Sequence, residues 1–360
     1  LTGSTLFIGG SLGAAANVNG GILGSFLGAK TAHDIRNALG RAQLSGRSAL
    51  MFDCVLENGR RFDVAVHRFK GSAIIEFEPA EANLAAPLEM ARAMIGRIAA
   101  IDSVERLAKD SARLVRAALG YDRVMIYQFG PDGAGKVVSE AKRADLESFL
   151  GQYFPATDIP QQARALYLKN TIRIISDADF ERIPVEPVLD ASGEPLDLSF
   201  AHLRSVSPIH CEYLRNMGVG ASMSISVIVD GGLWGLIACH HYSPRTLSMA
   251  ERVAAEMFGE FFSLHLNALR HKQTLDAAHR AREALDSFLR DTVGSHDING
   301  LLRDKLSQFA GLIPCDGAAM WLDGQMSIVG SVPPEAAILA LARFAETVAD
   351  GQIRATHKLA

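Results

Sequence analysis

Hydrophobic residues recur at two different periods along this chain, and the change of period separates strand segments from helical ones. Phe62, Val64 and Val66 alternate with more polar residues, which is the period of a strand that is buried on one face. Turn sequences that contain glycine flank this strand on both sides. The pattern therefore predicts three antiparallel strands between residues 49 and 79.

A helical pattern over residues 31–43 precedes these strands. A helix followed by three antiparallel strands fits a PAS-like domain, a small sensory α+β fold, which we place at residues 1–82. His67 lies on the polar side of the middle strand, and we expect it to face solvent.

The next segment, residues 83–265, begins with a helical pattern and continues with two predicted hairpins. Ser103 is a suitable N-cap, and the helix that follows it is expected to stop at Gly120. An irregular stretch separates the two hairpins. Helix, hairpin, irregular insert, hairpin and helix form, in that order, the pattern of a GAF domain.

Residues 248–293 lack proline and predict one long helix. At a rise of 1.5 Å per residue, such a helix is about 70 Å long, too long to bury one face within a small domain. We expect it to span domains and to meet a partner helix, so that two copies of the chain form a dimer through it and the GAF helices. The positions of its expected contact face are Val253, Met257, Phe261, Leu264, His271, Leu275, Ala278, Leu285 and Leu289.

Residues 294–360 repeat the order of the GAF segment. A helix and a strand are followed by a tight turn at Asp323-Gly324, a second strand and a helix that begins near Pro334. We therefore predict a partial second GAF-like domain. The fold class is α+β, with PAS-like and GAF-like antiparallel sheet domains joined by a long spine helix.

Composition excludes several classes of function. With 48% apolar residues, 21% charged residues and a net charge of −4, the sequence gives no reason to expect nucleic acid or a membrane as a partner. It contains no Gly-rich phosphate loop and no catalytic triad, so we expect no enzyme activity in this chain. The cysteines are too far apart for a zinc site or a disulfide framework, which fits a reducing cytoplasm. They are Cys54, Cys211, Cys239 and Cys315.

Polar residues gather in one central stretch. Arg173 and Arg204 lie in apolar surroundings, and buried arginines need anions, ideally carboxylates. Ser222 and Ser224 alternate along an apolar strand, so both hydroxyls face the same side. The stretch also contains Asp158, His210 and His240. This combination suits a large flat ligand that carries carboxylates and ring N–H groups.

Three motifs of this stretch resemble the chromophore-binding GAF domain of phytochromes, most closely the bacterial ones. They are FPATDIP from Phe154, SPIHCEYLRNMG from Ser207 and LWGLIACHH from Leu233, in the order of the family. The resemblance implies a PAS–GAF–PHY photosensory module, truncated at both ends, that binds the linear tetrapyrrole biliverdin and responds to red and far-red light. It also implies an output domain beyond the long helix, most often a histidine kinase that acts on a response regulator.

The resemblance assigns roles around the ring nitrogens. Asp158, in a motif with Ile159 and Pro160, offers its backbone carbonyl to the pyrrole nitrogens, and its carboxylate takes part in contacts that change on photoconversion. His210 corresponds to the histidine over the ring nitrogens. His240 corresponds to the histidine near the carbonyl of the outermost ring.

The resemblance also assigns the anchors of the ligand. Arg173 and Arg204 correspond to the arginines that bind the propionates, with Tyr167 nearby, and Ser222 and Ser224 to hydroxyls near the second propionate. The family has an aromatic cage around the ring that rotates. In this chain the corresponding residues are Tyr127, Phe154 and Tyr213.

This sequence differs from the family pattern in two ways that concern the covalent attachment of the bilin. Plant and cyanobacterial phytochromes attach their bilin to a cysteine at the position of Ile209. Bacterial phytochromes use a cysteine in an N-terminal arm, which this sequence does not contain. Cys211 is expected to be a small, partly buried residue that forms no such link.

Two alternatives to a phytochrome stay open at this point. A PAS–GAF sensor without a bilin could respond to redox state or to a small ligand, and the missing attachment cysteine favours it. An enzyme such as a metal hydrolase could use His240-His241, although no carboxylate or cysteine lies at the spacing of metal ligands.

Overall fold

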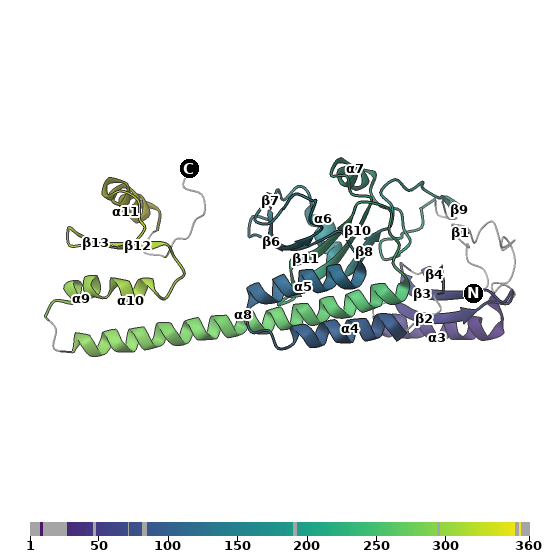
Figure 1. The fold of residues 1–360 in the computed structure, drawn as a ribbon, viewed down its shortest axis with the longest axis horizontal. Coiled ribbons are helices and arrows are strands. Elements are labelled where there is room, and N and C mark those ends of the chain that lie inside the picture. The colour runs from purple at the N-terminus through teal and green to yellow at the C-terminus, as the bar shows by residue number, and fades with distance from the viewer. Residues whose placement is uncertain are drawn as a thin grey trace. The chain divides into compact units, whose positions relative to one another are not determined.

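The computed structural model describes residues 8–9, 27–45, 48–70, 72–80, 85–189, 193–293, 296–349 and 353. The chain forms two compact units, Leu1–Leu269 and Arg270–Ala360. Figure 1 shows their helices and strands. Of the helices described, none combines the length and the apolar character that crossing a membrane requires.

The first sheet of the first unit is small and antiparallel, with the strand order β2-β3-β4. One face packs against the helix α3, because the alternating apolar residues of β3 meet Ile35 and Leu39 there. The prediction of a helix and three strands is therefore confirmed. The elements are α3 (Ala29–Ser45), β2 (Ala49–Val55), β3 (Arg61–Phe69) and β4 (Ser72–Pro79).

The opposite face of this sheet is polar, yet it is buried. His67 is only 5% exposed, so the prediction that it faces solvent is wrong. The larger domain covers this face: Arg252 forms an ion pair with Glu78, and the backbone N–H of Leu203 donates to Glu76. The period of the strand identifies the polar face, but it does not tell what covers that face.

The larger domain is built on a six-stranded sheet with the strand order β7-β6-β5-β11-β10-β8. The helix that precedes it begins and ends as predicted, since Ser103 Oγ accepts from the N–H of Arg106 and Gly120 has φ 66°. Its helices are α4 (Ala85–Ile98) and α5 (Val104–Leu119). The strands are β5 (Arg123–Phe129), β6 (Gly135–Lys142), β7 (Tyr153–Phe154), β8 (Ile172–Ile175), β10 (Ala221–Val229) and β11 (Gly232–His241). A further strand of this domain, β9 (Val185–Glu186), pairs with β1 (Ile8–Gly9).

The hydrophobic core lies on one face of the six-stranded sheet. In Figure 1, α4, α5 and the first half of α8 (Met249–Thr292) cover this face, while the short helices α6 (Gln161–Tyr167) and α7 (Pro208–Asn216) lie on the other. Ile225 and Ile237 of the sheet and Phe258 and Phe262 of α8 are all 1% exposed or less. A Cβ on Gly259 would lie 2.3 Å from Cγ2 of Ile225, so this glycine lets α8 approach β10 closely.

The long helix is confirmed, and the face that it buries in the first unit is not the one predicted to contact a partner helix. Met257 and Leu264, which we expected on its contact face, are 43% and 70% exposed. The core instead contains Phe258, Phe262 and Leu266, one or two positions further along. The predicted face is therefore largely left outside the core of the first unit.

The second unit contains the predicted order of helix, strand, turn, strand and helix. The expected first helix is divided at Lys305 into α9 (Ile298–Asp304) and α10 (Leu306–Ala310). The tight turn at Asp323-Gly324 is present, with φ 52° and 73° at its two residues. The remaining elements are β12 (Gly317–Leu322), β13 (Gln325–Gly330) and α11 (Glu335–Ala349).

Candidate functional site

The strand register places the predicted polar residues on the face of the six-stranded sheet that is opposite the core. Ser224 of β10 pairs with Arg173 of β8, and Ser222 pairs with His240 of β11. Directly paired residues share a face, and residues two apart along a strand return to it. Met223, between the two serines, points into the core. The prediction that both hydroxyls face the same side is therefore confirmed.

Among the residues that the structure describes, Arg173 has no carboxylate partner. Its guanidinium lies over the ring of Tyr167, 4.8 Å from the ring centroid. Nε and Nη2 are buried and have no hydrogen-bond partner among the residues described. Burial lowers the pKa of this guanidinium, and within the described part of the chain Tyr167, rather than a carboxylate, partly offsets that effect. Nε and Nη2 of Arg173 are therefore available to donate hydrogen bonds to an anion.

Arg204 lies close to this first arginine. Its Nη1 donates to the backbone carbonyl of Ala201 over 2.7 Å. Burial lowers the pKa of Arg204, and the charge of Arg173 lowers it further, while Glu76 partly offsets both. Two buried guanidinium groups that repel one another are a natural site for two carboxylates or one larger anion.

Two serines and a tyrosine hydroxyl lie on the same side of the sheet. The hydroxyl of Tyr167, at the end of α6, lies 3.2 Å from Oγ of Ser224. Ser226 donates to the backbone carbonyl of Tyr167 over 2.7 Å and fixes the end of that helix. Hydroxyl groups therefore lie next to the two arginines.

Both predicted histidines are neutral at neutral pH. Burial, followed by the charges of Arg123 and His210, lowers the pKa of His240 to about 4. Burial and the nearby charge of Arg173 lower the pKa of His210. Nδ1 of His240 is buried and lacks a partner among the described residues. His210 stacks on the ring of Tyr213, with 6.2 Å between centroids and 13° between planes.

Asp158 does not cap the helix that follows it. The N-cap of α6 is Pro160, and no side chain caps this helix. The carboxylate of Asp158 instead accepts a hydrogen bond from the hydroxyl of Tyr213 over 3.1 Å. Asp158 thus connects its segment, which contains Ile159, to α7.

Two of the three predicted cage residues, Tyr127 and Phe154, lie in one cluster on the same face of the sheet, whereas Tyr213 contacts His210 and Asp158. Tyr127 and Phe154 have ring centroids 6.0 Å apart. Burial and then the charge of Asp158 raise the pKa of Tyr127 to about 12, so its hydroxyl remains protonated. Phe129 and Phe149, which the sequence analysis did not identify, pack against this cluster.

Arg164 is a further residue that the sequence analysis missed. It donates to the backbone carbonyls of Ile159 over 2.7 Å, Gly133 over 2.5 Å and Ala156 over 3.2 Å. These contacts fix the segment before α6 to the turn between β5 and β6. The only signal in the sequence is an arginine on a short helix after a proline-rich segment, which is too general to identify such a role.

Arg123 and Glu140 form a buried ion pair beside the site, with side chains 2% and 3% exposed. The guanidinium also donates to the carbonyl of Glu147 and lies 3.9 Å from the centroid of the Phe149 ring. Burial is the main cause that lowers the pKa of His240, and the positive charge of Arg123, which pairs with it in register, lowers that pKa further. The sequence analysis missed this pair too.

The cysteines of this region are not arranged for attachment. Ile209, at the attachment position of the family, is 79% exposed. Cys211 is 3% exposed, and burial raises the pKa of its thiol. Cys239 points into the core, where burial also raises its thiol pKa. Raised pKa values disfavour the reactive thiolate at both cysteines.

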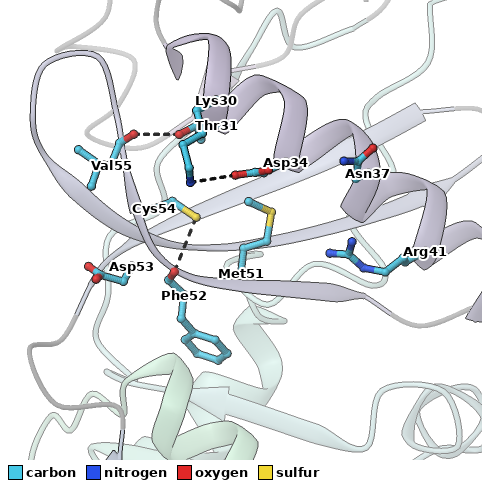
Figure 2. A pocket seen from close by; sticks show the side chains of 10 residues that line it. All are labelled: Lys30, Thr31, Asp34, Asn37, Arg41, Met51, Phe52, Asp53, Cys54 and Val55. Carbon is cyan, nitrogen blue, oxygen red and sulfur yellow. Dashed lines mark hydrogen bonds and ion pairs between the residues drawn. The ribbon is translucent and has the colours of Figure 1, made fainter.

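A hollow of about 490 Å³ lies on the smaller domain between α3 and β2, away from the residues described above. Figure 2 shows Lys30 paired with Asp34 and the hydroxyl of Thr31 bonded to the carbonyl of Val55. Its polar groups largely satisfy one another, and it contains none of the predicted site residues. We therefore assign the site to the six-stranded sheet. Across the described ranges, no three His, Cys, Asp or Glu side chains gather as metal ligands.

The unused polar atoms on the face opposite the core are suited to a ligand that carries carboxylates. Nε and Nη2 of Arg173 are unused donors for a propionate, and Nδ1 of His240 is unused beside an aromatic cluster. The positive charge of the two arginines is suited to a dianion. A large flat ligand with two carboxylates meets each of these needs.

Three family models match the chain in order. They are the PAS fold over residues 8–80, the GAF domain over residues 103–266 and the phytochrome region over residues 281–360. These matches confirm the predicted succession of domain types. The exact boundaries that we predicted between the domains stay predictions.

Known proteins of similar sequence and structure agree with these matches. A bacteriophytochrome of Pseudomonas aeruginosa is 40% identical over 76% of this chain and 38% of its own length. Cyanobacterial phytochrome B of Nostoc sp. is 36% identical over 83% of this chain and 40% of its own length. The structure of the Stigmatella aurantiaca phytochrome photosensory core module has a TM-score of 0.72 and 35% identity, over 91% of this chain and 66% of that one. The chain thus spans about two fifths of the length of these curated relatives.

Proposed function

This chain belongs to the phytochrome family, and we propose that it is the biliverdin-binding photosensory part of a red/far-red photoreceptor. Phytochromes are photoreceptors that bind a linear tetrapyrrole. The observation that carries the choice of a dicarboxylate ligand is the pair Arg173 and Arg204, two half-buried guanidinium groups that lie close together and form no ion pair of 4 Å or less with a carboxylate among the described residues. Bound biliverdin would supply the absorption of red and far-red light and the double bond that isomerises.

The arginines and hydroxyls would hold the two propionates. Arg173 has two free N–H groups for one carboxylate, and Arg204 is the anchor for the other. Ser222 and Ser224 share the face of Arg173 and would donate to the second carboxylate. Tyr167 supports this arrangement through its contacts with Arg173 and Ser224.

Asp158 and His210 would contact the ring nitrogens. The carbonyl of Asp158 accepts from ring N–H groups, while Ile159 and Pro160 fix its backbone. The carboxylate of Asp158 is bonded to Tyr213, and this contact can exchange when the ligand changes shape. His210 stacks on Tyr213, so the same tyrosine orders both residues.

His240, Tyr127 and Phe154 would surround the outermost ring. Neutral His240 can donate from one nitrogen and accept at the other, which suits a carbonyl acceptor. Tyr127 and Phe154 offer aromatic faces without a fixed charge. A ring can therefore turn there without breaking an ion pair.

We further propose how the change leaves the site. Thr171 directly precedes β8, and its hydroxyl donates a hydrogen bond to the carboxylate of Glu256 on α8. The start of β8 is therefore hydrogen-bonded to the long helix. The exposed side chains of Met257 and Leu264 would meet a second copy of the chain. In the full-length protein, which we expect in the cytoplasm, the output would be a histidine kinase that acts on a response regulator. A covalent link to biliverdin would come from a cysteine ahead of the PAS domain.

The test is titration of the 360-residue chain with biliverdin, followed by alternating red and far-red illumination. We expect tight binding, a red-shifted absorption band and a reversible change of that band. The Arg173→Ala/Arg204→Ala double variant should stay folded and bind much more weakly. The absence of any spectral change with the unaltered chain would refute the proposal and favour a sensor without a bilin.

A further inference from the structure

The loop that carries Arg204 is held by the smaller domain. Phe69, at the end of β3, packs edge-on against Phe200 with 4.6 Å between centroids. The adjacent Lys70 forms an ion pair of 2.8 Å with Asp197. One hairpin of the PAS domain thus contacts the GAF loop at two successive points before Arg204.

The third contact is buried and lies next to the arginine. Oε2 of Glu76, on β4, accepts a hydrogen bond from the backbone N–H of Leu203 over 2.7 Å. Glu76 is 6% exposed, and its Oε1 is buried without a partner among the described residues. Burying a carboxylate is costly, and the groups that offset this cost here are backbone N–H groups next to Arg204.

We propose that Glu76 is a positioning residue for the carboxylate-binding Arg204, so that a side chain of the PAS domain determines how well the GAF domain holds one propionate. Contacts within the loop give Arg204 little support, because among the hydrogen bonds described its side chain donates only to the carbonyl of Ala201. Glu76 fixes the backbone one residue earlier. The inference rests on the proposed binding of biliverdin.

The charge of Glu76 gives this role a measurable signature. The titratable groups that face it are His67 from β3, Glu78 from β4, His202 and Arg204 from the loop, and Arg252 from α8. Burial is the main cause that raises the pKa of Glu76, to about 7. Above that pH Glu76 is ionised and competes with a propionate for Arg204, whereas below it the neutral acid does not.

Biliverdin should therefore bind more weakly as the pH rises through 7. If the bound propionate raises the pKa of Glu76 by one unit, the Kd for biliverdin should be about tenfold higher at alkaline pH than at acid pH. Biliverdin dimethyl ester has no propionate charge, so its Kd should not show this dependence.

The experiment compares Glu76→Ala, Glu76→Gln and Glu78→Gln in the 360-residue chain. Kd is measured for biliverdin and for its dimethyl ester between pH 6 and 8.5, and folding is checked by circular dichroism. Glu78→Gln is the matched control, because Glu78 lies two residues away on the same strand and holds Arg252 of α8 rather than the loop.

At pH 6, where Glu76 is neutral and does not compete with the propionate, we expect Glu76→Ala to raise the Kd for biliverdin about tenfold and the Kd for the ester much less. Glu76→Gln keeps an acceptor for the N–H of Leu203, so it should restore binding and remove the pH dependence. Wild-type affinity in Glu76→Ala, equal losses for both ligands, or the same selective loss in Glu78→Gln would overturn the inference. If the unaltered chain binds neither ligand, the proposed function fails and the inference fails with it; if it binds both, only the role of Glu76 is in question.

Discussion

Replacing Arg173 with methionine should move stability and ligand affinity in opposite directions. Without ligand, this arginine has two buried N–H groups that lack partners among the described residues. Each buried, unsatisfied donor costs about 1–3 kcal/mol, whereas the contact of the guanidinium with the Tyr167 ring contributes only about 0.5–1 kcal/mol. The cost exceeds the gain, so the free energy of unfolding of the ligand-free variant should equal or exceed that of the wild type.

Binding of biliverdin should respond in the opposite sense. Loss of a charge-assisted contact with a carboxylate costs about 1.5–3 kcal/mol, which corresponds to a Kd about 10- to 150-fold higher. The same substitution should leave the affinity for biliverdin dimethyl ester nearly unchanged. Urea unfolding of the ligand-free protein and absorbance titration with each ligand measure the two quantities.

Arg113→Met is a suitable control, because Arg113 is exposed on α5 and its loss should alter neither quantity. The reasoning would be refuted if the ligand-free Arg173→Met variant were less stable by more than about 1 kcal/mol. It would also be refuted if both ligands lost affinity equally, because the arginine would then support the fold rather than bind a propionate.

Three further predictions concern other residues of the site. Asp158→Ala should still bind biliverdin but impair photoconversion, because the acceptor for Tyr213 is lost; a normal photocycle, followed by difference spectra, would contradict this. Cys211→Ser should leave any covalent link to biliverdin unchanged, since this thiol is buried and its pKa is raised; disappearance of the zinc-stained band on a denaturing gel would show the opposite. The pKa of His240 is about 4 when the protein is folded, below the ordinary value of 6.5 for histidine, so the unfolded chain takes up a proton first and stability falls as the pH drops from 6.5 to 4. The loss should be on the order of 3 kcal/mol for this residue, and His240→Gln should flatten the curve of unfolding free energy against pH; identical slopes would refute the assignment.

The sequence predicts best what depends on local periodicity. The alternation around Ser222 and Ser224 correctly gives their common side, and Ser103 and Gly120 correctly mark the ends of one helix. These features depend on a few neighbouring residues and on backbone geometry, so a single sequence contains them.

Features that depend on distant segments were predicted poorly. His67 lies on the polar side of its strand, but another domain covers that side. The sequence does not show which side of α8 packs on the sheet, because contact with distant strands selects that side. Arg164 contacts three backbone carbonyls from separate segments, which no spacing in the sequence reveals.

The core and the candidate site lie on opposite faces of one sheet, and this separation has a consequence for the order of events in the cell. Ile126, Ile225, Ile237, Phe258 and Phe262 pack together without any of the residues assigned to the ligand. Newly made chains can thus complete their tertiary structure before a pigment arrives. Folded protein without pigment would then be able to take up its ligand later, and the amount of ligand-bound protein would follow the supply of that ligand rather than the rate of translation.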